Sequence, residues 1–301
     1  MDSAPDPFIT RILGCIIVLL SLPGLYFNIS VFRHFLSIEK TSFYILCMSK
    51  TISNSFILLV NLLYNAPCAI LYTIIGSDSL NRYLNQAIGY GIYVIGPLTQ
   101  TIISINRFLV IWIFPTNVPS YSNRVTVATL FIFWLTGTYL STLIGFPESC
   151  RLKLILKPLD WSADDCADDS LDIFFNNFLY FVMFLGIISN FFNFLVIMKL
   201  LLSASRARSL SSESSRRRHK TTVRLFIQSC IQDGIYVVDM ANSLIMPGIV
   251  ENPIPRFIVS LGTNLVIHAT DGLVMYMFHR KTEKMKKASM ISVSPKLTRA
   301  G

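Results

Sequence analysis

Charged residues are scarce in this sequence. They make up 14% of its 301 residues, whereas soluble domains carry about 25%. Hydrophobic residues make up 52%, and the mean hydropathy is +0.55. A soluble protein of this length would not have a core large enough to bury so many apolar side chains. The composition therefore excludes an ordinary soluble fold and indicates an integral membrane protein.

Sequence motifs for catalysis and metal binding are also absent. No HExxH, GxSxG or P-loop sequence occurs, and the four histidines are scattered along the chain. Asp233 and Asp239 lie on one predicted helix, but six residues at 100° each leave them about 120° apart. They therefore cannot flank one scissile bond as a pair of carboxylates. We expect no enzyme activity, no metal site and no cofactor.

Seven apolar segments of about 20 residues or more follow one another along the chain. Each is long enough to cross about 30 Å of hydrocarbon as a helix, and the alternating pattern of a membrane barrel does not recur. We predict an all-α membrane protein, a seven-transmembrane helix bundle over residues 1–280 with a basic tail over 281–301. The predicted spans are 10–35, 43–66, 86–114, 125–146, 173–201, 223–246 and 256–279.

The distribution of basic residues predicts the orientation of the bundle. If the N-terminus is outside, twenty Lys and Arg residues fall in cytoplasmic segments, Lys50 and Arg107 among them, and six fall in outer segments. This bias satisfies the positive-inside rule. The net charge of +9 is then a topology signal, and no nucleic-acid binding is expected, because the basic residues flank membrane helices. We predict an N-terminus outside and a cytoplasmic C-terminus.

Arg107 is the one charged residue in "TQTIISINRFLVIWIFP" (99–115). Walking back from it in steps of 3 and 4 gives a set of residues that share one face of a helix, while the opposite face carries Ile, Leu and Val. The set is Tyr93, Pro97, Gln100, Ser104 and Arg107. We expect this stripe to face the bundle interior, with Arg107 at its cytoplasmic end. Arg107 is then either an anchor that snorkels to the interface or a functional group.

Four stretches in order carry a family resemblance. They are "CMSKTISN" (47–54), "SINRFLVIWIFP" (104–115), "RLFIQSCIQDGIYVVD" (224–239) and "HATDGLVMYMFH" (268–279). Together with seven spans, they resemble the nematode serpentine receptor class x family of rhodopsin-like, G-protein-coupled chemoreceptors, over roughly residues 9–280. The resemblance implies a chemosensory receptor that binds a small molecule within the bundle and activates a heterotrimeric G protein on the cytoplasmic face. It also implies a location in the plasma membrane, with the sensory cilium membrane as a candidate.

The resemblance assigns five residues to G-protein coupling. The Asp/Glu-Arg-Tyr triplet of many receptors reads here as Asn106, Arg107 and Phe108. Asn106 is not an acid and cannot form the ion pair that usually holds the arginine at rest. Either another group holds Arg107, or basal activity is higher. In span seven, Asp271 and Tyr276 replace the Asn-Pro-x-x-Tyr pattern, with the tyrosine one residue too far along.

Polar residues inside the predicted spans have two interpretations. Asn264, His268 and Asp271 are 4 and 3 residues apart and share a helix face, and an ionisable residue at membrane depth is a functional candidate. The alternative is a structural hydrogen-bond cluster with Asn28 or Asn54 on other helices.

The ligand candidates are aromatic and polar residues expected to face inward in the outer half of the bundle. Such a lining suits a small, partly apolar ligand, although each residue can also serve packing alone. The loop 147–172 has seven acids against three bases, which would favour cationic ligands, but the topology rule alone leaves an acidic exterior. The candidates are Tyr93, Pro97, Gln100, Asn177, Tyr180, Tyr236, Asp239 and Asn264.

Cys150 and Cys166 lie in this same outer loop, in a compartment that oxidises thiols. The pair matches the loop pattern of the family that the chain resembles. A bridge closing so short a loop would contribute about 3 kcal/mol by chain entropy. Cys68, at the outer end of span two, is a rival partner.

Two other function classes stay open at this point. A transporter or channel would use Asp233, Asp239, Asp271 and His268 as an ion or proton path through the bilayer. A non-signalling accessory membrane protein would show neither flux nor nucleotide exchange.

Overall fold

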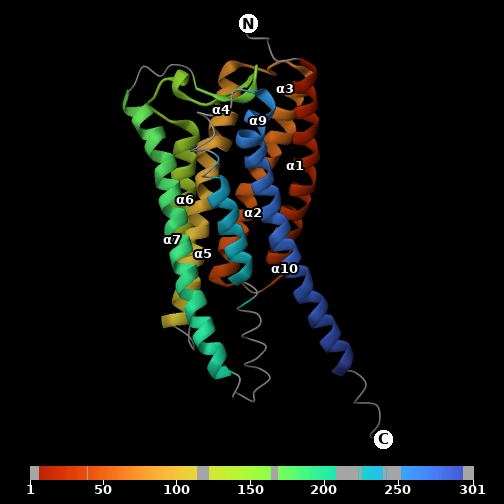
Figure 1. Ribbon diagram of the computed structural model, residues 1–301, viewed down its shortest axis with the longest axis vertical. Helices are drawn as coiled ribbons and strands as arrows, with labels where there is room; N and C mark the ends of the chain where they lie inside the picture. The colour runs from red at the N-terminus through yellow and green to blue at the C-terminus, as the bar shows by residue number, and fades with distance from the viewer. Residues whose placement is uncertain are drawn as a thin grey trace, which may run out of the picture.

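The computed structural model describes residues 7–38, 40–113, 122–163, 169–207, 223, 226–239, 242 and 252–293. In these residues, long helices run side by side in roughly one direction (Figure 1). A short β-hairpin and the start of the first helix lie at one end of this bundle, and the last helix ends at the other. We call the first end the hairpin end and the second the Arg107 end.

Six helices among the described residues are long and apolar enough to cross a membrane. The predicted sixth span, 223–246, contains the helical segment 226–239, and most of its other residues lie outside the described part. The individual α-helical elements, some of which join end to end into one span, are α1 (Pro7–Leu36), α2 (Ser42–Val60), α3 (Ala66–Leu71), α4 (Asp78–Gln86), α5 (Ile92–Phe108), α6 (Ser122–Thr142), α7 (Asp169–Ala207), α9 (Pro253–Phe257) and α10 (Thr263–Val293). This agrees with the predicted helical membrane fold.

Several of these helices join into longer rods through π-helical turns. The turns are η1 (Asn61–Asn65) between α2 and α3, η2 (Ala87–Gly91) between α4 and α5, η3 (Leu109–Ile113) after α5, and η5 (Ile258–Gly262) between α9 and α10. Side chains mark where the rods begin: Thr41 caps α2 by accepting from Tyr44 N at 3.4 Å, and Ser77 caps α4 by accepting from Leu80 N at 3.2 Å.

The bundle has an apolar outside and a partly polar inside. Phe131 and Phe184 are 65% and 57% exposed, and many other large apolar side chains are exposed along α1, α6 and α7. Water would not tolerate such extended apolar surfaces, whereas hydrocarbon would. Lys50, Asn54 and Asp271, in contrast, are at most 1% exposed. This inverted pattern fits a protein that spans a bilayer.

Two short strands form a hairpin that covers part of the hairpin end (Figure 1). Strands β1 (Lys153–Leu156) and β2 (Leu159–Ser162) are antiparallel, with Leu154 opposite Trp161. Asn81 of α4 holds the backbone of Leu154 from both sides: Nδ2 donates to its carbonyl at 3.0 Å, and Oδ1 accepts from its N–H at 3.1 Å. The side chain of Asn81 thus replaces a neighbouring strand.

Further polar contacts fasten the hairpin to the helices. Trp161 Nε1 donates to Asn85 Oδ1 at 2.9 Å, and Arg256 Nε of α9 donates to Asp160 Oδ2 at 2.5 Å. Gln86 accepts from Leu152 N at 3.0 Å, and its amide nitrogen donates to Leu140 O. These buried partners explain why the helical rod begins at Asp78, eight residues before the predicted start of span three.

Candidate functional site

A buried ion pair occupies the middle of the bundle. Lys50 Nζ of α2 lies 2.9 Å from Asp271 Oδ1 of α10, and the two side chains are 0% and 1% exposed. Burying either charge alone would be costly, and a close partner reduces that cost. The sequence interpretation that counted Lys50 among the cytoplasmic basic residues is therefore wrong. Lys50 lies near the start of a long span, but its side chain finds a carboxylate inside the bundle.

Polar side chains from two more helices complete the surroundings of this ion pair. Lys50 Nζ donates to Gln100 Oε1 of α5 at 2.7 Å and lies 5.0 Å from the centre of the Tyr236 ring. Asp271 Oδ1 accepts from Gln232 Nε2 at 2.6 Å. We call Lys50, Gln100, Gln232, Tyr236 and Asp271 the Lys50 cluster. It joins α2, α5, the segment 226–239 and α10 through charge-assisted hydrogen bonds, which are stronger than neutral ones.

Asparagines extend the cluster to α1. Asn54 Nδ2 donates to Asp271 Oδ2 at 2.6 Å, and Asn54 Oδ1 lies 2.8 Å from His268 Nδ1. Since the amide oxygen only accepts, Nδ1 carries the proton in this arrangement. Asn28 Nδ2 of α1 donates to His268 O at 3.1 Å. The hydrogen-bond cluster expected as the structural alternative is thus present for His268 and Asp271, whereas no hydrogen bond joins Asn264 to it in the described residues.

Gly272 is needed for this junction of α1 with α10. A Cβ atom placed on it would overlap the side chain of Asn28. The Asp-Gly step in span seven therefore has a packing reason: Asp271 supplies the charge, and the next residue leaves room for the asparagine that crosses from α1.

The predicted polar stripe on α5 is buried along its whole length, as its spacing predicts. Tyr93, Gln100 and Ser104 are 5%, 2% and 0% exposed, and Arg107 is only 8% exposed. The Arg107 guanidinium lies 4.9 Å from the centre of the Phe43 ring, a cation–π contact. None of its nitrogens has a hydrogen-bond partner among the described residues. Arg107 therefore does not extend to the surface as a snorkelling anchor would.

The other residues assigned to coupling lie apart from Asp271. Asn106 is half-buried, and the Phe108 ring stacks on Trp112 and meets Phe192 of α7, with centroids 5.9 and 5.2 Å away. The Tyr276 ring faces α1, 5.4 Å from Phe27. The structure thus brings Asp271, but not Tyr276, into the Lys50 cluster.

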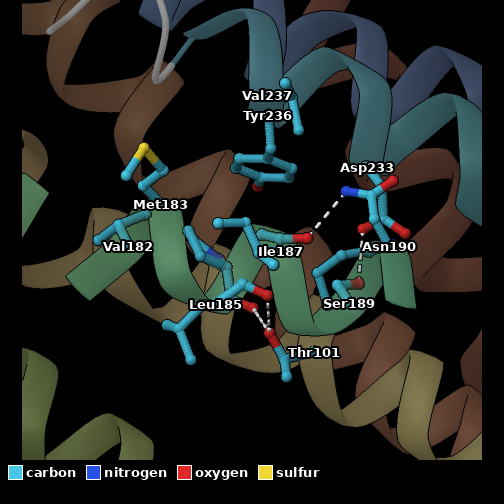
Figure 2. Close-up of a pocket in the computed structure, with 13 residues that line it drawn as sticks. Thr101, Val182, Met183, Leu185, Ile187, Ser189, Asn190, Asp233, Tyr236 and Val237 are labelled. Atoms are coloured by element: carbon cyan, nitrogen blue, oxygen red, sulfur yellow. Dashed lines mark hydrogen bonds between the residues drawn. The ribbon is translucent and has the colours of Figure 1, made fainter. Parts of the chain in front are cut away.

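A cavity of about 470 Å³ lies between α5, α7 and the segment 226–239 (Figure 2). Three of the predicted ligand residues line it: Pro97, Gln100 and Tyr236. Asp233 also lines it, accepting from Ser189 Oγ at 2.9 Å and from Asn193 Nδ2. Gln100 and Tyr236 also belong to the Lys50 cluster, so the cavity wall and this cluster share two side chains.

The remaining predicted ligand residues have different positions. Tyr93, Asp239 and Asn264 are buried, and Tyr93 Oη donates to Asp239 Oδ2 at 2.5 Å. These three residues therefore face the bundle interior, but none of them lines the cavity. Asn177 is exposed and Tyr180 is 57% exposed, which corrects the prediction that they face the bundle. The buried face of α7 instead carries Phe178, Val182, Leu185, Ser189 and Asn193, and a residue two positions along a helix is turned by about 200°.

Lys50 and Asp233 are the residues that sequence reasoning undervalued. Lys50 and Asn54 are four residues apart in "CMSKTISN", so one helix face carries both. That spacing, together with an acid in span seven, was the signal from which a buried Lys50 could have been predicted.

The predicted disulfide is only partly described. Cys150 is buried and disulfide-bonded, and Cys68 is a free thiol. Cys166 lies outside the described residues, so its pairing with Cys150 stays a prediction.

Comparison with known proteins identifies the family. The sequence profile of the serpentine type 7TM GPCR chemoreceptor Srx matches residues 18–279. No curated protein matches the chain. The crystal structure of squid rhodopsin is similar in fold, with a TM-score of 0.71 at 15% sequence identity, over 92% of this chain and 78% of that one. The chain therefore belongs to the Srx family of seven-transmembrane, G-protein-coupled chemoreceptors.

Proposed function

We propose that this chemoreceptor binds a small molecule in the cavity between α5, α7 and the segment 226–239, and signals through the Lys50 cluster to a heterotrimeric G protein at the Arg107 end. The observation that carries this proposal is the double role of Gln100. Its side chain lines the cavity and also accepts the hydrogen bond of Lys50 Nζ at 2.7 Å. A ligand that moves Gln100 changes the surroundings of the buried ion pair.

The Lys50 cluster is suited to two alternative arrangements. It ties four helices together by a few strong, directional contacts, and a ligand shifts such an equilibrium by its differential affinity for the two states. Loss of the Gln100 contact would weaken the link between α5 and α2 while the bond of Lys50 to Asp271 persists. The Arg107 end of α5 then moves relative to its neighbours.

The orientation in this proposal places the hairpin end outside and the Arg107 end in the cytoplasm. The bias of basic residues supports it, and so does the disulfide-bonded Cys150 at the hairpin end. The expected location is the plasma membrane, including that of a sensory cilium.

A transporter or channel is the weaker candidate. Asp271 pairs with Lys50, Asp239 accepts from Tyr93, and Asp233 accepts from residues of α7. Each of the three acids thus already has a hydrogen-bond or ion-pair partner among the described residues. Uptake or current in reconstituted membranes without G protein would favour this alternative.

Basal nucleotide exchange on a purified heterotrimeric G protein tests the proposal without a known ligand. Lys50→Met leaves Asp271 buried and unpaired, which costs about 3–5 kcal/mol in comparable pairs, whereas Lys50→Met with Asp271→Asn removes both charges. We expect both variants to change basal exchange per receptor at the surface, and the double variant to recover surface expression. Unchanged exchange in the double variant at normal expression would contradict the role of the cluster.

A further inference from the structure

The cavity beside α7 has one polar side and one aliphatic side. Figure 2 shows Ser189, Asn190 and Asp233 on one side and Val182 and Met183 on the other. Its volume of about 470 Å³ falls within the usual range of small-molecule sites, about 300–1,000 Å³. An occupant that matches this lining has an apolar body and one polar group.

The cavity opens toward the lipid. Three of its lining residues are strongly exposed, Ile187 by 59%, Val237 by 47% and Met183 by 37%. Met183 and Ile187 belong to Tyr180–Leu202, a stretch long and apolar enough to span a membrane, so we expect acyl chains to lie against them. At the hairpin end, β1 and β2 are fastened to α4 by the side chains of Asn81 and Asn85. Among the described residues, the exposed side of the cavity is the one formed by Met183, Ile187 and Val237.

Asp233 gives the polar side of the cavity its chemistry. Its side chain is buried, with the residue only 3% exposed, and its carboxylate accepts from Ser189 Oγ and Asn193 Nδ2, which are both neutral donors. Within the described part of the chain, no Lys or Arg forms an ion pair with it, in contrast to Asp271 and Lys50. A carboxylate at this depth is stabilised by a cation, and a carboxylate has about four lone-pair sites for donors.

Tyr236 adds a second polar atom at the same cavity. The residue is 5% exposed, and its hydroxyl has no hydrogen-bond partner among the described residues. A buried hydroxyl in a cavity wall normally has a partner. A ligand with donor and acceptor capacity at one end can supply it.

We propose that the cavity binds a lipophilic primary amine that arrives through the bilayer, with its ammonium group on Asp233 and its hydrocarbon part between Val182, Leu185 and Val237. This inference names the ligand class for the site in the proposed function. Its signalling consequence rests on that function, whereas binding itself does not.

Binding is measured on the full-length receptor in lipid nanodiscs, by the shift of the thermal unfolding midpoint. The probes are octylamine, octan-1-ol and octanoic acid, which share a chain and differ in the head group. We expect octylamine to raise the unfolding midpoint in a saturable way. The other two probes should need at least about tenfold higher concentrations for the same rise, because hydrogen bonds between charged groups are the strong ones. Equal responses to the amine and the alcohol would overturn the proposal.

Two variants with matched controls locate the site. Asp233→Asn removes the charge and Gly186→Leu fills the cavity, since a Cβ at Gly186 meets no atom within 4 Å. We expect each to weaken octylamine binding about tenfold or more. Asp239→Asn and Gly234→Leu are the controls: neither residue lines the cavity, and a Cβ at Gly234 is equally unobstructed.

The outcomes separate the site from the signalling role. Loss of binding in Asp233→Asn and Gly186→Leu, with binding kept in both controls, supports the amine site. Octylamine binding that survives Gly186→Leu in a folded receptor overturns it. If binding follows the expected pattern but octylamine leaves nucleotide exchange unchanged, the site stands and the proposed signalling function is contradicted.

Discussion

Ser104 Oγ and Ser189 Oγ lie 2.7 Å apart and join α5 to α7 within the buried core. Ser189 also donates to Asp233 Oδ1 at 2.9 Å, and Ser104 is three residues before Arg107 on the same face of α5. These contacts lead from Asp233 in the cavity wall to Ser104, on the face of α5 that also carries Arg107. Such contacts are a physical basis for coupling, and measured coupling has to establish it.

Ser189→Ala removes both contacts at once. We expect a loss of about 1–3 kcal/mol in stability, because the Asp233 carboxylate loses a donor in a buried site, together with altered basal nucleotide exchange. Thermal unfolding and exchange at equal surface expression are the measurements. Ser55→Ala is the control, since among the described residues the Ser55 hydroxyl bonds to Thr51 O of its own helix and to no other helix. Equal effects of the two changes would argue against a specific role for Ser189.

Gly272→Ala should destabilise the junction of α1 and α10. The new Cβ overlaps the Asn28 side chain, and overpacking in a dense core typically costs about 1–3 kcal/mol. Gly234→Ala is the matched control, because its Cβ meets no atom within 4 Å and alanine favours a helix over glycine by about 0.5–1 kcal/mol. The unfolding midpoint should fall in the first variant and rise or stay unchanged in the second. A stable Gly272→Ala receptor with normal expression would mean that Asn28 relaxes freely.

The sequence alone predicts the helices and the inward stripe well, for identifiable reasons. Span length follows from bilayer thickness, so predicted 10–35 and 125–146 lie close to the helices Pro7–Leu36 and Ser122–Thr142. The stripe from Tyr93 to Arg107 stands out because polar residues at helical spacing interrupt an apolar run. The hydrogen-bond cluster around His268 and Asp271 was an explicit alternative for the same reason.

The features that the sequence does not reveal depend on distant partners. The location of Lys50 depends on Asp271, on a helix far along the chain, and a count of charges near span ends treats every lysine there as exposed. The inward face of α7 is hard to predict because this helix is apolar nearly all round, so Tyr180 has no periodic signal. The polar residues of α4 are buried where the hairpin and the end of α6 pack against them.

The bridge between Cys150 and Cys166 is a prediction that peptide mapping can test. Digestion of the full-length receptor under non-reducing conditions should give one linked peptide pair containing these two cysteines, while Cys68 stays free. A linked pair that joins Cys150 to any other cysteine would rule out the intraloop bridge.

The orientation of the bundle has a direct test of its own. An epitope inserted between residues 208 and 220 should be reachable by antibody only after the cells are permeabilised, because this basic segment is expected in the cytoplasm. An epitope joined to the N-terminus should be reachable on intact cells and serves as the control. Labelling of the 208–220 epitope on intact cells would reverse the orientation and remove the basis for G-protein contact at the Arg107 end.

Arg107 offers the most direct test of the account, because the proposed signal ends there. Its guanidinium is buried against Phe43 with no hydrogen-bond partner among the described residues, and Asn106 supplies no acid. We therefore expect measurable ligand-independent nucleotide exchange. Lysine carries the charge but lacks the planar fork of donors.

The measurement is basal nucleotide exchange on a heterotrimeric G protein, divided by surface expression, for Arg107→Lys and Arg107→Ala, with Arg124→Lys as control, since Arg124 is an exposed arginine on α6. The account predicts that exchange falls about tenfold or more in both Arg107 variants and stays unchanged in the control. Full exchange in both Arg107 variants at normal surface expression would contradict it and leave Arg107 with a packing role against Phe43.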